Sequence, residues 1–138
     1  MMQRPRSLLL IMIFALLAAC SLESGAPAIS QQQPLNTING GGDILILDVR
    51  TAGEYAEGFI SGAKHLDHRK VNARLHEVSE HKQRPVVVYC LSGIRAAMVE
   101  STLIENGFDR AFHLQGDWSA WKESSLPITK PGENSAQL

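Results

Sequence analysis

The chain has 138 residues, of which 44% are hydrophobic, and a formal net charge of −1. This length and composition suit one globular domain with a moderate core, and they exclude a disordered chain. The near-neutral charge offers no basic surface for nucleic acid, so we expect no nucleic-acid partner.

The first 19 residues are typical of an export signal. Arg4 and Arg6 give a cationic start, and an apolar run follows from Leu8 to Ala19. This run is shorter than the roughly 18 apolar residues that span a bilayer as a helix, so a transmembrane anchor is the weaker interpretation.

The segment that ends at Cys20 has the sequence LAAC, which resembles a bacterial lipobox. In a lipobox the peptide is cut before the cysteine, and that cysteine is lipidated. We therefore predict a lipoprotein signal peptide at residues 1–19, lipidation of Cys20, and an exported, periplasm-facing protein anchored to the bacterial envelope. Ser21 favours the outer membrane over the inner one. The alternative is an ordinary secretory signal whose cysteine has no role.

Two polar segments are predicted to flank a single domain. Residues 20–28 are small and polar with one proline, as in a tether, and residues 129–138 form a predicted flexible tail. The domain is predicted at residues 29–128. If Cys20 carries lipid, Cys90 has no partner in the chain. A solitary thiol in an exported protein needs a chemical role or a buried site.

The first strong strand signal is the apolar run Ile44–Leu47, which follows three glycines. An unbroken apolar run is typical of a strand buried on both faces. Thr51 and Glu54 have the spacing of a capping box, which predicts a short helix that ends at Gly58.

The middle of the chain contains two further strand signals and a helix between them. Residues 63–66 suit a brief strand, and residues 86–89 suit a second strongly apolar one. From Arg69 to His81 apolar residues recur at helical spacing, which predicts one buried stripe. That stripe consists of Val71, Leu75 and Val78.

The last part of the chain repeats this alternation. After the loop that begins at Cys90, a helix is predicted to end at Gly107. Residues 111–114 suit a fourth strand, and residues 117–123 suit a short helix. The buried stripe predicted for the helix before Gly107 consists of Ala97, Met98, Ser101 and Ile104.

Strands that alternate with helices favour an α/β fold whose parallel sheet is covered on both faces. Ligands of such sheets bind outside the carboxyl ends of the strands. Cys90 follows the most apolar strand at that end, and Asp48 and Arg50 follow the other strong strand. We therefore expect these three residues at the same edge of the sheet.

The loop from Cys90 to Arg95 has the composition of an anion-binding nest. Its backbone N–H groups can turn inward at the start of a helix, and Arg95 adds a positive charge. Both features favour thiolate over thiol, which is the condition for nucleophilic sulfur. Gly93 permits the close bend of the backbone. The alternative is that Cys90 is an inert hydrophobic residue of the core.

Over residues 29–128 the chain resembles single-domain rhodaneses, which are sulfurtransferases. The resemblance implies a five-stranded parallel sheet with helices on both sides, and a first helical segment that starts at Ile29-Ser30. The loop from Cys90 to Arg95 has six residues, as in rhodaneses, whereas related phosphatases of the same fold have one more. The segments that carry the resemblance are Leu47–Arg50, Glu54-Tyr55, Gly58–Ala63, Val86–Arg95, Glu105–Phe108, Leu114–Asp117, Trp121 and Leu126-Pro127.

The resemblance assigns Cys90 as the nucleophile that takes a sulfane sulfur from thiosulfate or a related small anionic donor. The resulting persulfide passes the sulfur to a thiol or to cyanide. Asp48 and Arg50 resemble a supporting pair that holds the loop by charged hydrogen bonds. No metal and no cofactor are expected. The implied substrate-binding residues are Leu91, Ser92, Gly93, Ile94 and Arg95.

Four residues depart from the family pattern. Leu91 and Ile94 make the mouth of the loop more apolar than in many thiosulfate-using relatives, which leaves the donor open. Phe59 and Asp117 replace a common histidine and a common glycine, and both are expected to lie away from the nucleophile. The five histidines of the chain are interpreted as surface or packing residues.

A second function stays open at this point. A persulfide carrier would accept sulfur from one partner and deliver it to another without turnover on small donors. The presence of Cys90 and Arg95 argues against a purely structural interaction domain, because such domains commonly lose the cysteine. The sequence leaves the oligomeric state open.

Overall fold

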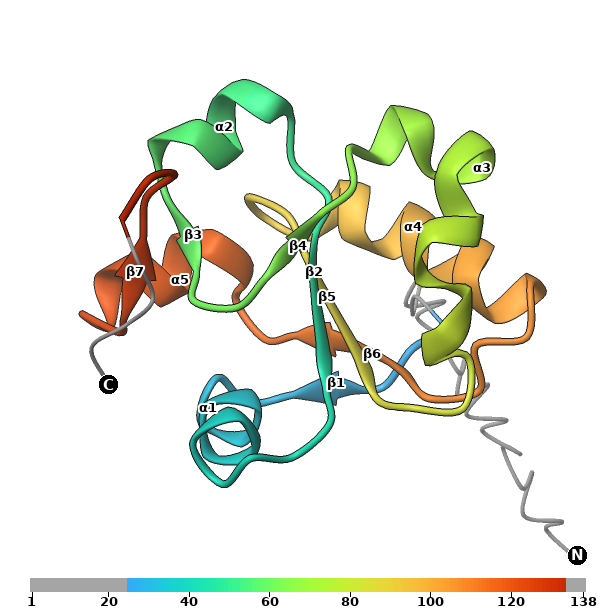
Figure 1. Ribbon diagram of the computed structural model, residues 1–138, viewed down its shortest axis with the longest axis horizontal. Coiled ribbons are helices and arrows are strands. Elements are labelled where there is room, and N and C mark those ends of the chain that lie inside the picture. The colour runs from blue at the N-terminus through green and yellow to red at the C-terminus, as the bar shows by residue number, and fades with distance from the viewer. Residues whose placement is uncertain (1–24, 134–138) are drawn as a thin grey trace, which may run out of the picture.

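A computed structural model describes residues 25–133, so the predicted signal peptide and Cys20 lie outside the described residues. Its main sheet has five parallel strands in the order β1-β6-β5-β2-β4, which confirms the expected α/β fold (Figure 1). The strands of this sheet are β1 (Ala28–Ile29), β2 (Leu45–Asp48), β4 (Lys64–His65), β5 (Val86–Tyr89) and β6 (Ala111–Leu114).

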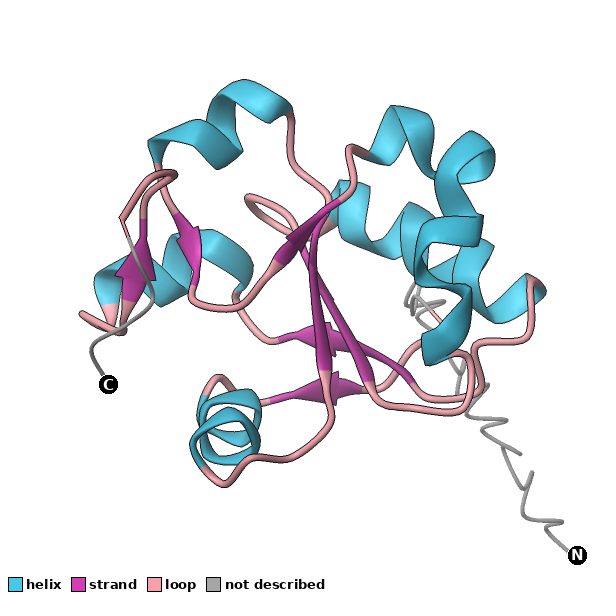
Figure 2. Ribbon diagram, in the orientation of Figure 1, coloured by secondary structure: helices cyan, strands magenta, loops and turns pink. Residues whose placement is uncertain are grey.

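Helices cover both faces of this sheet (Figure 2). The α-helices are α1 (Gln32–Asn39), α2 (Ala52–Glu57), α3 (Val71–Arg74), α4 (Ile94–Glu105) and α5 (Asp117–Glu123), and two 3₁₀ helices span His68–Lys70 and Leu75–His81. No helix of residues 25–133 is long and apolar enough to cross a membrane.

Two hydrophobic clusters form the core, one on each face of the sheet. Every residue of β2 and β5 is buried, as expected for central strands of a parallel sheet. On one face Val71, Val78 and Leu103 bring α3, the second 3₁₀ helix and α4 against the strands. On the other face α5 contributes Trp121, and α1 contributes Leu35. The predicted stripe of residues 69–81 is therefore confirmed.

The region predicted as one helix from Arg69 to His81 is divided among three short helical segments. Two side chains donate to backbone carbonyls of this region. Lys64 Nζ donates to the carbonyl of Glu77 at 2.6 Å, and Ser79 Oγ donates to the carbonyl of His76 at 2.8 Å.

The first helix does not start at Ile29-Ser30. Ile29 instead ends the edge strand β1, where it pairs with Leu114 of β6, and α1 begins at Gln32. Pro34 lies in the first turn of α1, where its missing N–H costs no helical hydrogen bond because the carbonyl four residues earlier lies before the helix. Ala26, which the sequence assigns to the tether, is 7% exposed, so packed structure precedes residue 29.

The buried face of α4 differs from the predicted one. Met98 is 62% exposed and Ile104 is 42% exposed. Both the predicted and the observed stripes have helical spacing. The observed stripe contains Glu100, and a glutamate is expected on the exposed face of a helix. The buried residues of α4 are Ala96, Val99, Glu100 and Leu103.

A two-stranded antiparallel sheet lies beside the main one and was not predicted. It pairs β3 (Phe59–Ile60) with β7 (Ile128–Thr129). Each strand has two residues, which is too short for a periodic pattern in the sequence. This pair places Thr129, which the sequence assigns to the tail, within the folded structure.

Candidate active site

Cys90 lies at the carboxyl edge of the main sheet. It directly follows β5, and its neighbour Tyr89 is paired with Asp48, the last residue of β2. The loop after β5 therefore lies beside the segment that contains Asp48 and Arg50 (Figure 1). The expectation that these residues meet at one edge is confirmed.

The sulfur of Cys90 accepts a hydrogen bond from the backbone N–H of Gly93, with a distance of 3.1 Å between nitrogen and Sγ. Gly93 has a φ of 105°, in the left-handed region, and is the residue before α4. Cys90 itself is 1% exposed. The sequence predicted donation from several amides of the loop, and the contact seen at Sγ comes from one of them.

The amino-terminal end of α5 fixes the orientation of the loop. The N–H of Trp118 donates to the carbonyl of Cys90 at 3.0 Å, and the N–H and hydroxyl of Ser119 donate to the carbonyl of Leu91 at 3.2 and 2.9 Å. In a trans peptide the N–H points opposite to the C=O. The N–H groups of Leu91 and Ser92 must therefore point away from α5.

Arg95 forms a paired contact with Glu54 of α2 rather than a free anion site. Its two terminal nitrogens donate to the two carboxylate oxygens at 2.7 and 2.8 Å. Hydrogen bonding to Glu54 is the main cause that raises the pKa of Arg95. The guanidinium thus stays charged beside the cysteine, but its strongest partner is Glu54 and not a substrate.

Glu54 joins α2 to the Cys90 loop. Its carboxylate accepts from the N–H and the hydroxyl of Thr51, so the predicted capping box is confirmed. The hydrogen bond from Arg95 is the main cause that lowers the pKa of Glu54 from 4.5 to about 2. One carboxylate therefore caps a helix and orients the arginine of the loop.

Glu54→Gln should destabilise the protein in a pH-dependent way. Because the folded state lowers the pKa of Glu54, its contribution to stability is complete above pH 4.5 and disappears as the pH falls toward about 2. Urea unfolding at pH 7 and at pH 3 measures this. The difference in free energy of unfolding from the parent should shrink at the lower pH. Glu57→Gln, on the exposed face of the same helix, should show no such difference, and equal costs at both pH values for Glu54→Gln would contradict the prediction.

Asp48 and Arg50 form a buried ion pair, with 2.6 Å between Arg50 Nη2 and Asp48 Oδ2. Asp48 Oδ2 also accepts from the hydroxyl of Tyr89 at 2.6 Å, and Arg50 donates to the carbonyl of Gly58 at 2.7 Å. The guanidinium lies 4.3 Å from the ring centre of Trp118. The pair therefore supports the residues on either side of the loop, and the bonds seen in the structure do not run to residues 91–95 themselves.

Asp117 and His113 lie directly beneath the loop, contrary to the sequence interpretation. Asp117 Oδ1 accepts from the N–H of Cys90 at 2.8 Å, and Asp117 Oδ2 lies 3.0 Å from His113 Nε2. Asp117 has a φ of 53°, which explains why glycine suits this position. Aspartate in place of the family's common glycine was the sequence signal for these contacts, because a non-glycine residue with left-handed backbone needs compensating contacts.

Gly93→Ala should destabilise the protein by about 1–3 kcal/mol, because alanine would have to adopt the left-handed backbone of this residue. The added Cβ would also lie 3.2 Å from Asp117 Oδ2. Urea unfolding measures the effect. Gly53→Ala is the control, since a Cβ there meets no atom within 4 Å, and it should leave stability unchanged or raise it. Equal stability of the two variants would contradict the geometry given for Gly93.

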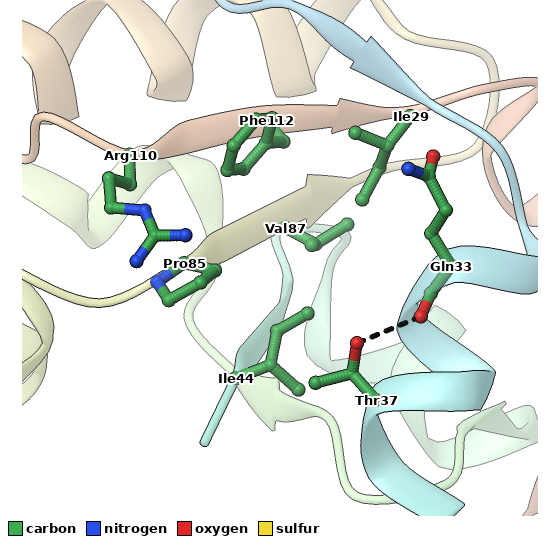
Figure 3. A pocket seen from close by; sticks show the side chains of 8 residues that line it. All are labelled: Ile29, Gln33, Thr37, Ile44, Pro85, Val87, Arg110 and Phe112. Carbon is green, nitrogen blue, oxygen red and sulfur yellow. Dashed lines mark hydrogen bonds between the residues drawn. The ribbon is translucent and has the colours of Figure 1, made fainter. Parts of the chain in front are cut away.

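A surface pocket among the described residues lies on the face of the sheet that α1 covers and does not belong to this site. It lies between α1 and the sheet, and its lining includes residues within β1, β5 and β6 and the residues just before β2, β5 and β6 (Figure 3). Cys90 follows the opposite end of β5, so this pocket gives no access to the thiol. The residues that line it are Ile29, Gln33, Thr37, Ile44, Pro85, Val87, Arg110 and Phe112.

The parallel sheet and the cysteine loop at its carboxyl edge define an α/β domain with the Cys90 thiol at that edge. A family model for the rhodanese-like domain matches residues 31–124, and the chain belongs to that family.

Named relatives agree with this assignment, and a solved structure shares the fold. A protein of Allochromatium vinosum named sulfurtransferase is 37% identical over 89 residues, which are 64% of this chain and 81% of the relative. A Coxiella burnetii protein named thiosulfate sulfurtransferase GlpE is 42% identical over 82 residues, which are 58% of this chain and 73% of the relative. A crystal structure of a protein from Lactobacillus plantarum has a TM-score of 0.65 at 27% identity, covering 73% of this chain and 86% of that chain.

Proposed function

We propose that the protein is a sulfurtransferase that carries sulfur as a persulfide on Cys90. The Cys90 thiolate attacks the outer sulfur of thiosulfate or a related donor, and a new S–S bond forms. The S–S bond of the donor breaks, and sulfite leaves with its electron pair. A thiolate or cyanide then attacks the outer sulfur of the persulfide and releases the Cys90 thiolate. The assignment depends most on the N–H of Gly93 at Cys90 Sγ, because a core thiol needs no such donor.

The loop would serve both steps by facing an anionic sulfur with N–H groups. Gly93 already donates to Sγ, and the contacts with α5 turn the N–H groups of Leu91 and Ser92 away from that helix. Arg95, held by Glu54, adds a fixed positive charge at the end of the loop. Donors fixed before the reaction stabilise developing negative charge more than donors that must reorganise. The six-residue loop favours sulfur over the larger phosphate.

A second candidate, a persulfide carrier that exchanges sulfur with other proteins, is favoured by the apolar residues around the loop. Ile94 is 76% exposed, Met98 is 62% exposed and Leu91 is 41% exposed. Ile94 and Met98 are one helical turn apart on α4, so they lie on the same side of the helix. Such a rim suits contact with a protein better than contact with a small anion.

Sulfur transfer from thiosulfate to cyanide by the purified protein separates the candidates. The sulfurtransferase should form thiocyanate with repeated turnover. A carrier should form a persulfide on Cys90 without turnover. Absence of both products would contradict the proposal. Aryl phosphates should not be hydrolysed, and hydrolysis that depends on Cys90 would instead favour a phosphatase.

A further inference from the structure

A chain of three titratable side chains runs from α4 to the backbone of Cys90. Glu100 Oε1 lies 2.6 Å from His113 Nδ1, and His113 Nε2 lies 3.0 Å from Asp117 Oδ2. The other oxygen of Asp117 accepts from the N–H of Cys90 at 2.8 Å. Four elements thus meet in one hydrogen-bonded chain: α4, β6, α5 and the loop after β5.

Hydrophobic packing alone does not account for this chain. Glu100 is 0% exposed, and its Oε2 has no hydrogen-bond partner among the described residues. A buried carboxylate with one unpaired oxygen costs free energy, whereas an apolar side chain at this position would extend the stripe of Ala96 and Leu103. Its observed hydrogen-bond partner is His113, so Glu100 links α4 to β6, which an apolar residue could not do through a hydrogen bond.

The protonation of His113 agrees with its hydrogen bonds to two acidic side chains. Among the described residues the acidic side chains that contact His113 are Asp117 of α5 and Glu100 of α4, while Val88 of β5 and Ala28 of β1 lie beside it in the sheet. Hydrogen bonds first to Asp117 and then to Glu100 raise the pKa of His113 to about 10. Both ring nitrogens therefore carry protons at neutral pH and donate to the two carboxylates.

One end of the sulfur-binding turn is hydrogen bonded to Asp117, and the other end lies close to Asp117 and His113. Asp117 holds the N–H of Cys90, and a Cβ on Gly93 would lie 3.2 Å from Asp117 Oδ2 and 3.5 Å from His113 Nε2. Gly93 is the residue that donates to Cys90 Sγ. The distance between the sulfur and its N–H donor thus depends on where Asp117 and His113 lie.

We propose that Glu100, His113 and Asp117 are positioning residues that fix the Cys90 loop in the geometry needed for sulfur transfer. The proposal rests on the proposed function. The described residues contain no group of three or more side chains placed to hold a metal ion, and these three bond to one another in sequence rather than to a common point. Glu100, His113 and Asp117 therefore act on the reaction through the loop and not through substrate contact.

The pH dependence of the sulfur-transfer rate of Glu100→Gln tests the positioning role of these three residues. The loss of one carboxylate should lower the pKa of His113, so the imidazole should lose its proton as the pH rises through a value below 10. Between pH 7 and pH 9.5 the sulfur-transfer rate should then fall about tenfold relative to the parent, because a charged hydrogen bond that positions the loop is lost. Glu105→Gln, an exposed position on the same helix, should follow the parent profile.

Two further measurements separate positioning from simple stability. The histidine Cε1–H NMR signal of His113 should titrate at lower pH in Glu100→Gln than in the parent. Asp117→Gly removes the acceptor of the Cys90 N–H but tolerates the left-handed backbone, so it should fold and still transfer sulfur about ten to a hundred times more slowly.

Alkylation of Cys90 by iodoacetamide keeps the test independent of the proposed function. If the parent transfers no sulfur, the proposed function fails, yet Asp117→Gly should still change the alkylation rate of Cys90 about tenfold because the loop geometry has changed. Alkylation and transfer rates equal to the parent's in a folded Asp117→Gly protein would overturn the positioning role. A Glu100→Gln profile that runs parallel to the parent's while the His113 signal shifts would also overturn it.

Discussion

Cys90→Ser should abolish sulfur transfer, with a loss of more than about a thousandfold, because the variant removes the nucleophile itself. A serine hydroxyl is not ionised at neutral pH and cannot form a persulfide. The substitution is close in size, and the N–H of Gly93 can donate to the new oxygen as it does to Sγ. The loss of activity is therefore expected without a loss of the fold. Thiocyanate formation from thiosulfate and cyanide measures it.

The control for Cys90→Ser is the free energy of unfolding in urea. Cys90 is 1% exposed and belongs to one of the two core clusters, so a buried serine hydroxyl should cost about 1–3 kcal/mol, which the hydrogen bond from Gly93 partly offsets. A folded Cys90→Ser protein that retains transfer would show that another group carries the sulfur. If Cys90→Ser does not fold, the parent protein with Cys90 alkylated tests the need for the thiol instead. This alkylated protein should also be inactive.

Asp48→Ala should cost about 3–5 kcal/mol of stability, because it leaves the Arg50 charge buried without its partner. The two side chains are 0% and 2% exposed. The variant also takes away the acceptor of the Tyr89 hydroxyl, so a second buried polar group loses its hydrogen bond. Urea unfolding measures the difference.

Asp43→Ala is the matched control for Asp48→Ala. Asp43 pairs with Arg84 at 2.6 Å, as short as the buried pair, but the two side chains are 59% and 49% exposed. Exposed ion pairs contribute about 0–1 kcal/mol because water screens them. The buried and exposed aspartates should therefore differ by several-fold in cost, and similar costs would contradict the structural role assigned to the Asp48–Arg50 pair.

The parts of the fold that follow from local pattern were predictable from the sequence. Unbroken apolar runs predicted β2 and β5, and the Thr51–Glu54 spacing predicted the start of α2. The alternation of strands with helices predicted that Cys90 lies at the carboxyl edge of the sheet. Each of these signals lies within a short stretch of chain and needs no knowledge of distant partners.

The features that the sequence did not reveal depend on distant partners. Glu100 is buried because His113, 13 residues away, pairs with it, so the true buried face of α4 contained a residue that reads as solvent-exposed. Asp117 reaches the N–H of Cys90 across 27 residues of sequence. Pairings of this kind override local hydrophobic pattern, and no periodicity in a single chain marks them.

Whether Cys90 carries the sulfur is measured by the mass of the Cys90 peptide after the protein has reacted with thiosulfate in the absence of an acceptor. This peptide should gain the mass of one sulfur atom, the gain should disappear when cyanide is added, and it should be absent in Cys90→Ser. A sulfur atom found on another residue, or no gain while thiocyanate still forms, would contradict the assignment of Cys90 as the sulfur carrier.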